Sequence, residues 1–240
     1  FQSLDIRVSC LFRISYFFKV FKTPMDALHL SIALGPVALY FLVLGLINIT
    51  PRPFMTTGAR DWAVLGLAIS GFVVAGPMEL FFPENAAGTF GAFVWALLIA
   101  LYGLAVVLLC LLSRPRLVIY NLTAEELRST MNKCLPLLDP DVHWAGDTLI
   151  LPNLGVQAHL EPFTALKNVQ IVASGPRQNY LGWRQFELQL AQALREMRVA
   201  PNPYGVTQLI FAAAILIAVT FYIVNDQQAV AQSLREMLRW

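Results

Sequence analysis

The densest group of side chains that could do chemistry lies between residues 139 and 159. Asp139, Asp141, His143 and Asp147 follow one another closely, and His159 could face them across a hairpin. Carboxylates and imidazoles in such a group can bind a metal ion or act as general acid and base. The competing interpretation is structural, because Asp-Pro-Asp and Gly-Asp are typical of turns and strand starts. We favour the structural interpretation and predict no metal ligand and no catalytic residue.

A second candidate is a polar loop between a strand and a helix, formed by Ser174, Gly175, Arg177, Gln178 and Asn179. Backbone N–H groups at a helix N-terminus can bind an anion, and the arginine would add a positive charge. The loop lacks the glycine spacing of a P-loop or of a dinucleotide-binding turn. The pattern therefore supports an anion-binding loop only weakly.

Motifs that would specify an enzyme are missing from the sequence, which contains neither a GxSxG nor an HExxH pattern. The cysteines, Cys10, Cys110 and Cys134, are too widely spaced for a disulfide framework or a zinc site. A net charge of +2 is too small to indicate a nucleic-acid partner. The sequence thus predicts no cofactor and favours a protein that is not an enzyme.

The elements that must position these residues are dominated by apolar stretches. Hydrophobic residues make up 57% of the 240-residue chain and charged residues 13%, about half of the ~25% usual in soluble domains. No charged side chain lies between Glu84 and Arg114. A helix over 90–112 would be about 35 Å long, enough for the ~30 Å core of a bilayer. Similar stretches predict three further transmembrane helices, over 28–47, 62–80 and 206–224.

Small residues recur along the second and third of these helices. They predict a helical hairpin in which the two helices approach closely; the alternative is that alanine and glycine are simply common in membrane helices. The predicted packing residues are Gly66, Ser70, Gly71, Ala75, Ala92, Ala96, Ala100 and Gly103. Asp61 is expected to N-cap the second helix.

From Ser113 the patterns become those of a soluble α+β domain in the order β-α-β-β-β-α. Thr123 and Glu126 form a capping box at the start of its first helix. Cys134 lies on the apolar face of that helix, which favours a core position over a nucleophile. We therefore predict an all-α membrane protein with four transmembrane helices, arranged 3+1, and this small domain inserted between helices three and four. Both domain helices should cover one face of the sheet, leaving the other as a binding surface.

The predicted parts follow one another along the chain. The first part, residues 1–24, is basic and aromatic. Such a segment is typical of a membrane-surface helix or a targeting segment. The alternative, which we favour, is that translation starts at Met25 and that 1–24 is sequence read through from upstream. The last is an amphipathic tail with Val230, Leu234, Met237 and Leu238 on one side. The boundaries are 1–24 for the basic segment, 25–112 for the three-helix region, 113–203 for the domain, 204–225 for the fourth helix and 226–240 for the tail.

Positive charge predicts the orientation, since lysine and arginine favour the cytoplasmic ends of transmembrane helices. Arg52 and Arg60 in the first loop, and Arg114 and Arg116 before the domain, place both segments inside the cell. The turn around Glu84 is then outside, as is the C-terminus. The expected location is the cell membrane, inner or plasma.

Three functions fit these features. The leading hypothesis is a non-enzymatic, membrane-anchored adaptor or sensor whose cytosolic domain binds a protein partner or a second copy of the chain, with the lipid bilayer around its helices. The alternative is a membrane enzyme or transport-complex subunit that acts at the cytoplasmic membrane face. A third hypothesis is a small-molecule sensor that uses a cleft between the domain and the transmembrane helices.

Overall fold

The structure is a computed structural model. It describes residues 27–78, 80, 82, 83, 86, 89–175 and 178–238. The predicted segment 1–24, Met25 and Glu84 lie outside the described residues, and so do the side chains of Met237 and Leu238.

Among the described residues, four helices are long and apolar enough to cross a membrane, as predicted. Only 11–17% of the residues in their most apolar windows are buried within the protein. Such a surface is stable against hydrocarbon and unstable against water. The four are α2 (Ala27–Ile49), α3 (Gly58–Val73) with its π-helical extension η1 (Val74–Met78), α5 (Phe93–Leu112) and α8 (Tyr204–Asn225).

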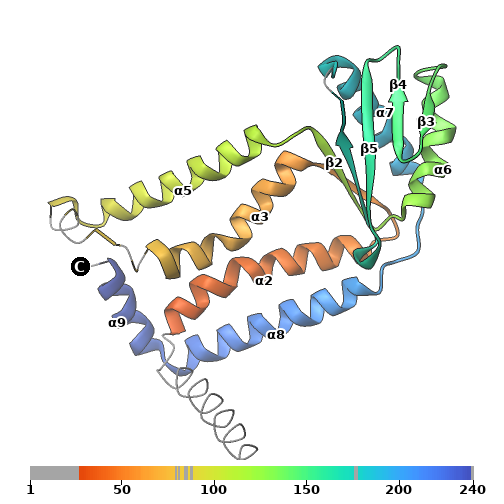
Figure 1. Ribbon diagram of the computed structural model, residues 1–240. Coiled ribbons are helices and arrows are strands. Elements are labelled where there is room, and N and C mark those ends of the chain that lie inside the picture. The colour runs from red at the N-terminus through yellow and green to blue at the C-terminus, as the bar shows by residue number, and fades with distance from the viewer. Residues whose placement is uncertain are drawn as a thin grey trace, which may run out of the picture.

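These helices lie side by side in the order α5, α3, α2, α8 (Figure 1). The closest approaches are made where glycine removes a side chain. A Cβ atom on Gly71 of α3 would lie 1.9 Å from the carbonyl oxygen of Ile32 in α2. On the other side of α2, a Cβ atom on Gly45 would lie 2.8 Å from the side chain of Leu209 in α8. Glycine thus allows α2 to pack between α3 and α8.

The contact between α3 and α5 differs from the predicted stripe of small residues. Gly66 of α3 faces a large side chain, Val106 of α5, and its carbonyl oxygen accepts a 2.6 Å hydrogen bond from the Tyr102 hydroxyl. Ala96 and Ala100 are exposed instead. A glycine opposite a valine packs closely without a matching small residue, so the alanine face of α5 can turn away from α3.

The remaining predicted packing residues have varied surroundings. Gly71 contacts α2 and not α5. Ser70 is half-buried and donates its hydroxyl hydrogen bond within its own helix, to the carbonyl oxygen of Leu67. Ala75 and Ala92 are half-buried. A Cβ atom on Gly103 would meet no described atom within 4 Å.

The described strands form one six-stranded sheet in the order β1-β2-β6-β5-β4-β3, with every neighbouring pair antiparallel. Two of the six were not predicted, the edge strands β1 and β3. The bounds are β1 (Phe54–Thr57), β2 (Arg116–Tyr120), β3 (His143–Ala145), β4 (Thr148–Leu151), β5 (Val156–Phe163) and β6 (Asn168–Ala173).

Strand β1 comes from the loop between α2 and α3, so the sheet is not built from residues 113–203 alone. Its four residues pair with β2, from Phe54 opposite Tyr120 to Thr57 opposite Leu117. Paired strands lie about 4.8 Å apart. The first loop and the rest of the sheet must therefore lie on the same side of any membrane that the helices cross.

Two helices cover one face of the sheet, as predicted: α6 (Ala124–Cys134), extended by the 3-10 turn η2 (Leu135–Leu137), and α7 (Tyr180–Glu196). The predicted capping box is present at the start of α6, where the amide of Glu126 donates to the Thr123 hydroxyl and the amide of Thr123 to the Glu126 carboxylate. Another 3-10 turn, η3 (Thr164–Leu166), joins β5 to β6.

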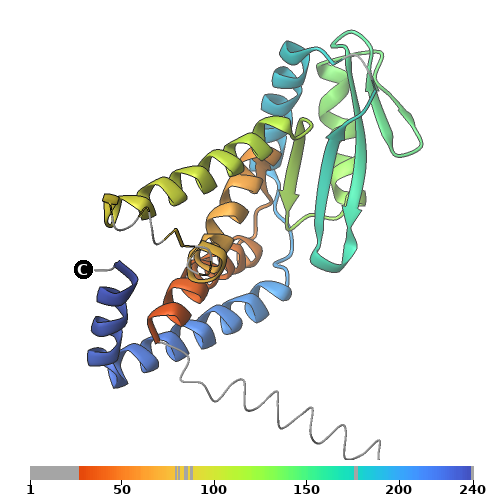
Figure 2. The same cartoon turned by 60° about the vertical axis from the view of Figure 1, so that its left-hand side comes forward.

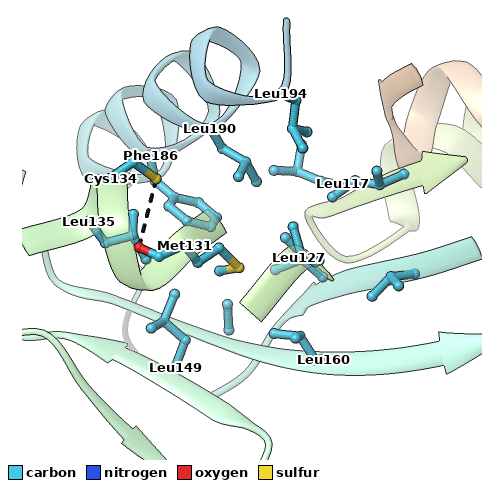
Figure 3. Packing of buried hydrophobic residues seen from close by; sticks show 14 of the residues in the cluster. Leu117, Leu127, Met131, Cys134, Leu135, Leu149, Leu160, Phe186, Leu190 and Leu194 are labelled. Atoms are coloured by element: carbon cyan, nitrogen blue, oxygen red, sulfur yellow. Dashed lines mark hydrogen bonds between the residues drawn. The ribbon is translucent and has the colours of Figure 1, made fainter. Parts of the chain in front are cut away.

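Figure 3 shows the core between these helices and the sheet. Phe186 and Leu190 of α7 meet Met131 of α6 and Leu117 of β2, and all four are buried. Cys134 belongs to the same cluster, as its apolar position predicted, and burial raises the pKa of its thiol. A neutral buried thiol is a packing group rather than a nucleophile.

The sheet and the C-terminal helix α9 (Gln227–Leu238) lie at opposite ends of the long helices (Figure 2). Helix α9 folds back from α8 towards α2. Its predicted apolar side includes Val230, which is half-buried, and Leu234, which is 43% exposed.

We expect Gly71→Ala to destabilise the packing of α3 on α2, because the added methyl group would overlap the Ile32 backbone, which cannot rotate away. Overpacking of this kind costs about 1–3 kcal/mol. Thermal unfolding of the detergent-solubilised protein should show a lowered Tm. The matched control is Gly103→Ala, where the methyl group enters open space among the described residues; an equal loss in both variants would contradict the packing described here.

Candidate functional site

The predicted polar cluster at 139–159 is divided among separate contacts. Asp139 is fully buried, at 0% exposure. Its carboxylate accepts hydrogen bonds from the amide of Asp141 at 3.1 Å, the amide of Asn153 at 2.9 Å and the Asn153 side-chain nitrogen at 2.7 Å. These bonds join the loop after α6 to the turn after β4, and buried polar groups paired in this way hold loops in place.

The other members of the cluster have partners of their own. Asp147 pairs with Arg128 at 2.7 Å on the surface. His143 Nδ1 lies 2.9 Å from the Asp141 carbonyl oxygen, and His159 Nδ1 lies 3.2 Å from the Thr148 hydroxyl. Within the described ranges, no group of three or more His, Cys, Asp or Glu residues could hold a metal ion. Each of these described side chains therefore has a partner within the fold.

The predicted anion-binding loop is occupied by its own side chains. Asn179 is the N-cap of α7 and accepts hydrogen bonds from the amides of Leu181 and Gly182 at 3.0 and 3.4 Å. The Gln178 side-chain nitrogen donates to the carbonyl oxygens of Gln157 and Ser174. The amides of Leu181 and Gly182, at the start of the helix, are therefore engaged by the cap. Gly175 has a φ of +87°, and Arg177 lies outside the described residues.

A site that the sequence did not predict lies where the sheet meets the long helices. Asp61 does not N-cap its helix, because α3 begins at Gly58 and Asp61 falls within its first turn. The Tyr120 hydroxyl, at the end of β2, donates a 2.5 Å hydrogen bond to Asp61 Oδ1. Arg116 Nη2 lies 3.7 Å from Asp61 Oδ2, and the guanidinium of Arg116 lies 5.2 Å from the centre of the Trp62 ring.

The cleft beside this Asp61–Tyr120 pair has a volume of about 390 Å³. Helix α2 forms one wall, from Tyr40 to Ile47; strand β1 and the first turns of α3 form the others. The lining is mostly apolar, and Arg60 is its cationic member. Arg60 is exposed and has no hydrogen bond or ion pair with any residue that the structure describes. We call this space the junction cleft.

Three buried asparagines fasten the sheet to the long helices. Asn121, at 0% exposure, donates a 2.9 Å hydrogen bond to the carbonyl oxygen of Thr50, just after α2. Asn202 lies before α8. Its backbone amide donates to the carbonyl oxygen of Asn48, and its side-chain nitrogen donates to the carbonyl oxygen of Leu166. The Asn48 side chain donates to Gln208 of α8 at 2.8 Å. We call Asn48, Asn121 and Asn202 the asparagine junction.

The sequence contains weak signals of both features. Asn48 and Asn202 stand at the ends of predicted transmembrane helices, where polar residues are common and carry no specific meaning. Asp61 and Tyr120 are 59 positions apart, so only the fold brings them together.

Comparison of the chain with protein-family models, with curated proteins and with solved structures finds no match. The function must therefore be inferred from the chain's own geometry.

We expect Tyr120→Phe to lower the stability of the folded protein at neutral pH, because it removes a hydrogen bond to a charged carboxylate. Such bonds contribute about 1.5–3 kcal/mol, and the partial exposure of Asp61 favours the lower end. The check is the Tm of the variant against Tyr180→Phe, a control at a 79% exposed tyrosine.

The same pair should also make stability depend on alkaline pH. Burial raises the pKa of Tyr120, and its hydrogen bond to Asp61 and that carboxylate's charge raise it further. The stabilisation is complete below the unfolded-state pKa of about 10 and is lost as pH rises above it, because the unfolded chain ionises first. Wild-type Tm should fall more steeply than that of Tyr120→Phe above this pH, and parallel curves would show that Tyr120 is not protected.

Proposed function

We propose that the protein is a non-enzymatic integral membrane protein that works as an adaptor or sensor. Its four long helices span the cell membrane. The α+β domain, residues 113–203 inserted between the third and fourth helices and joined by β1 of the first loop, binds a protein partner or a second copy of the chain on the cytoplasmic side. The main support is the rigid attachment of the sheet to the helices through β1 and the asparagine junction.

This attachment is stronger than anchoring alone would need. A domain that is merely tethered can hang from flexible linkers. Here the segment before α8 is held by Val199 and Asn202, whose amides donate to the carbonyl oxygens of Pro51 and Asn48. Lys167 Nζ adds a 3.0 Å hydrogen bond to the carbonyl oxygen of Ala200. A partner that moves the sheet would therefore also move α2 and α8.

The open face of the sheet, opposite α6 and α7, is the surface we assign to the partner. Its exposed or half-buried side chains include Gln157, His159 and Glu161 of β5. The strand registers place His159 beside Val172, and Val172 beside Arg116. Side chains opposite each other on adjacent antiparallel strands share a face. This row therefore runs from the exposed part of the sheet to the arginine that pairs with Asp61.

The enzyme alternative has less support. The residues with suitable chemistry at 139–159 each contact the backbone or a nearby side chain, such as Arg128, Thr148 or Asn153, and Asn179 caps its helix. In both places the described polar groups support the local fold, and no observation links them to a substrate.

The cytoplasmic location of the domain is supported by charge. Arg52 and Arg60 flank β1, and Arg114 and Arg116 lead into and begin β2, so the pairing of these strands gathers four arginines at one end of the helices. Basic residues at one end of transmembrane helices favour the cytoplasm. Helix α9, at the other end, would then be outside.

This orientation predicts the behaviour of reporter fusions. A phosphatase that is active only outside the cytoplasm should be active when fused after Trp240 and inactive when inserted in the Gly146–Asp147 turn. The measurement is phosphatase activity per fusion protein expressed. The reverse pattern would place the domain outside and contradict the proposal.

The adaptor function predicts selective contacts of the open sheet face in the cell. A photo-crosslinking amino acid at Gln157 or Glu161 should give one discrete protein adduct, identified by mass spectrometry. The same probe at Ser129, an exposed position on α6, is the control. No discrete adduct from either sheet position, or the same adduct from all three positions, would be evidence against a partner on this face.

A further inference from the structure

We propose that the junction cleft binds an anionic phospholipid from the surrounding bilayer, with an acyl chain between α2 and α3 and the phosphate at Arg60. This inference goes beyond the proposed function, because a lipid could occupy the cleft whether or not a protein binds the sheet.

The size and lining of the cleft suit part of a lipid. Its volume of about 390 Å³ falls in the ~300–1,000 Å³ range of small-molecule sites. Val43 and Leu44 of α2, Phe54 of β1 and Val64 of α3 contribute apolar walls. Val43, Phe54 and Val64 are each 45% exposed, so the apolar lining is accessible from the side of the protein that hydrocarbon would cover.

The polar and apolar parts of the cleft are arranged as in a bilayer leaflet. Arg60 lies in the first turn of α3, at the end of the helices where the sheet stands. The α2 wall runs from Ile47, near the end of that helix, back to Tyr40. From Tyr40 to Ile47 the helix rises by seven steps, about 10 Å. The cleft thus begins at headgroup depth and continues into the hydrocarbon, which a water-soluble anion would not require.

The charged residues at the cleft favour a lipid with an anionic headgroup. Asp61 brings a negative charge to the cleft, but the Tyr120 hydroxyl and the Arg116 guanidinium already interact with its carboxylate. Arg60 and Asp61 are the charged residues of the lining. Arg116 lies outside the lining and pairs with Asp61, so the charge of Asp61 is offset from outside the cleft and that of Arg60 is not. The guanidinium of Arg60, without a partner among the described residues, can bind a phosphate through two parallel hydrogen bonds. An anionic lipid should therefore bind better than a zwitterionic one.

A lipid in this position would connect three elements. It would contact α2, β1 and α3, next to the Asp61–Tyr120 pair. Since a ligand that binds only the folded arrangement stabilises it, the lipid should strengthen the attachment of the sheet to the helices.

The test uses the full-length protein purified in mild detergent. Native mass spectrometry and Tm are recorded against increasing phosphatidylglycerol, with phosphatidylcholine of the same acyl chains and with glycerol 3-phosphate as comparison probes. We expect one retained phosphatidylglycerol and a Tm that rises with its concentration. Arg60→Gln should weaken this binding about tenfold or more, as expected for loss of a charge-assisted contact. Arg52→Gln, which removes an exposed arginine outside the cleft, should leave binding unchanged.

Three results would overturn the proposal: equal binding of both lipids, equal losses in the two arginine variants, or the same stabilisation by glycerol 3-phosphate, which would indicate a site for free anions. Val64→Phe provides a second variant if Arg60→Gln does not fold, because it narrows the cleft at a partly exposed position and keeps the charge. It should also lose selective binding, and full retention would equally refute the lipid site. The crosslinking positions, Gln157 and Glu161, do not line the cleft, so this test and the crosslinking test can fail independently.

Discussion

The pairing of β1 with β2 is the constraint on which the rest of the structure depends. It joins a four-residue strand between α2 and α3 to the strand that follows α5. Once Thr57 lies opposite Leu117, α3 must start beside β2, and the contacts at the junction follow. Gly58 then lies so close to Arg116 that a Cβ atom would be 2.1 Å from the arginine side chain. The same placement brings Asp61 to Tyr120.

At this junction, hydrogen bonds hold the sheet against the long helices, whereas apolar packing holds α6 and α7 against the sheet. Buried amides are costly without partners, because the interior offers no water to replace a lost hydrogen bond. The asparagine junction satisfies its donors across segments far apart in the chain, which makes the contact specific as well as stabilising. An apolar contact between the sheet and α2 could slide, whereas the bonds of Asn121 and Asn202 to particular carbonyl oxygens fix one position.

The open sheet face and the junction cleft are connected through one residue, Arg116. Arg116 takes part in both, since it shares the open face with Val172 and pairs with Asp61 beside the cleft. A partner on the sheet and a lipid in the cleft would therefore act on the same few bonds. If both bind as proposed, each should change the affinity for the other through the contacts of Arg116 and Asp61. This coupling requires no movement of one domain against another.

Much of the fold could be predicted because its signals are local. The apolar stretches identified the four long helices, and the capping box at Thr123 and the apolar face of α7 identified helices of the domain. The edge strands escaped prediction because β1 and β3 are four and three residues long. Runs this short show no reliable alternation, and only their partner strands stabilise them. The prediction that the small residues of α5 pack against α3 was too specific, since Ala96 and Ala100 are exposed. A small side chain permits close packing but does not specify which helix will pack there.

The sequence by itself determined which segments suit hydrocarbon and which suit water, since both depend on the composition and periodicity of neighbouring residues. Only the tertiary structure decided that the first loop completes the sheet, that Asp61 meets Tyr120, and that a cleft with a cation at its mouth opens between α2 and α3. Those features depend on contacts between residues tens of positions apart, whose energies are realised only when the chain has folded and leave no local pattern to read.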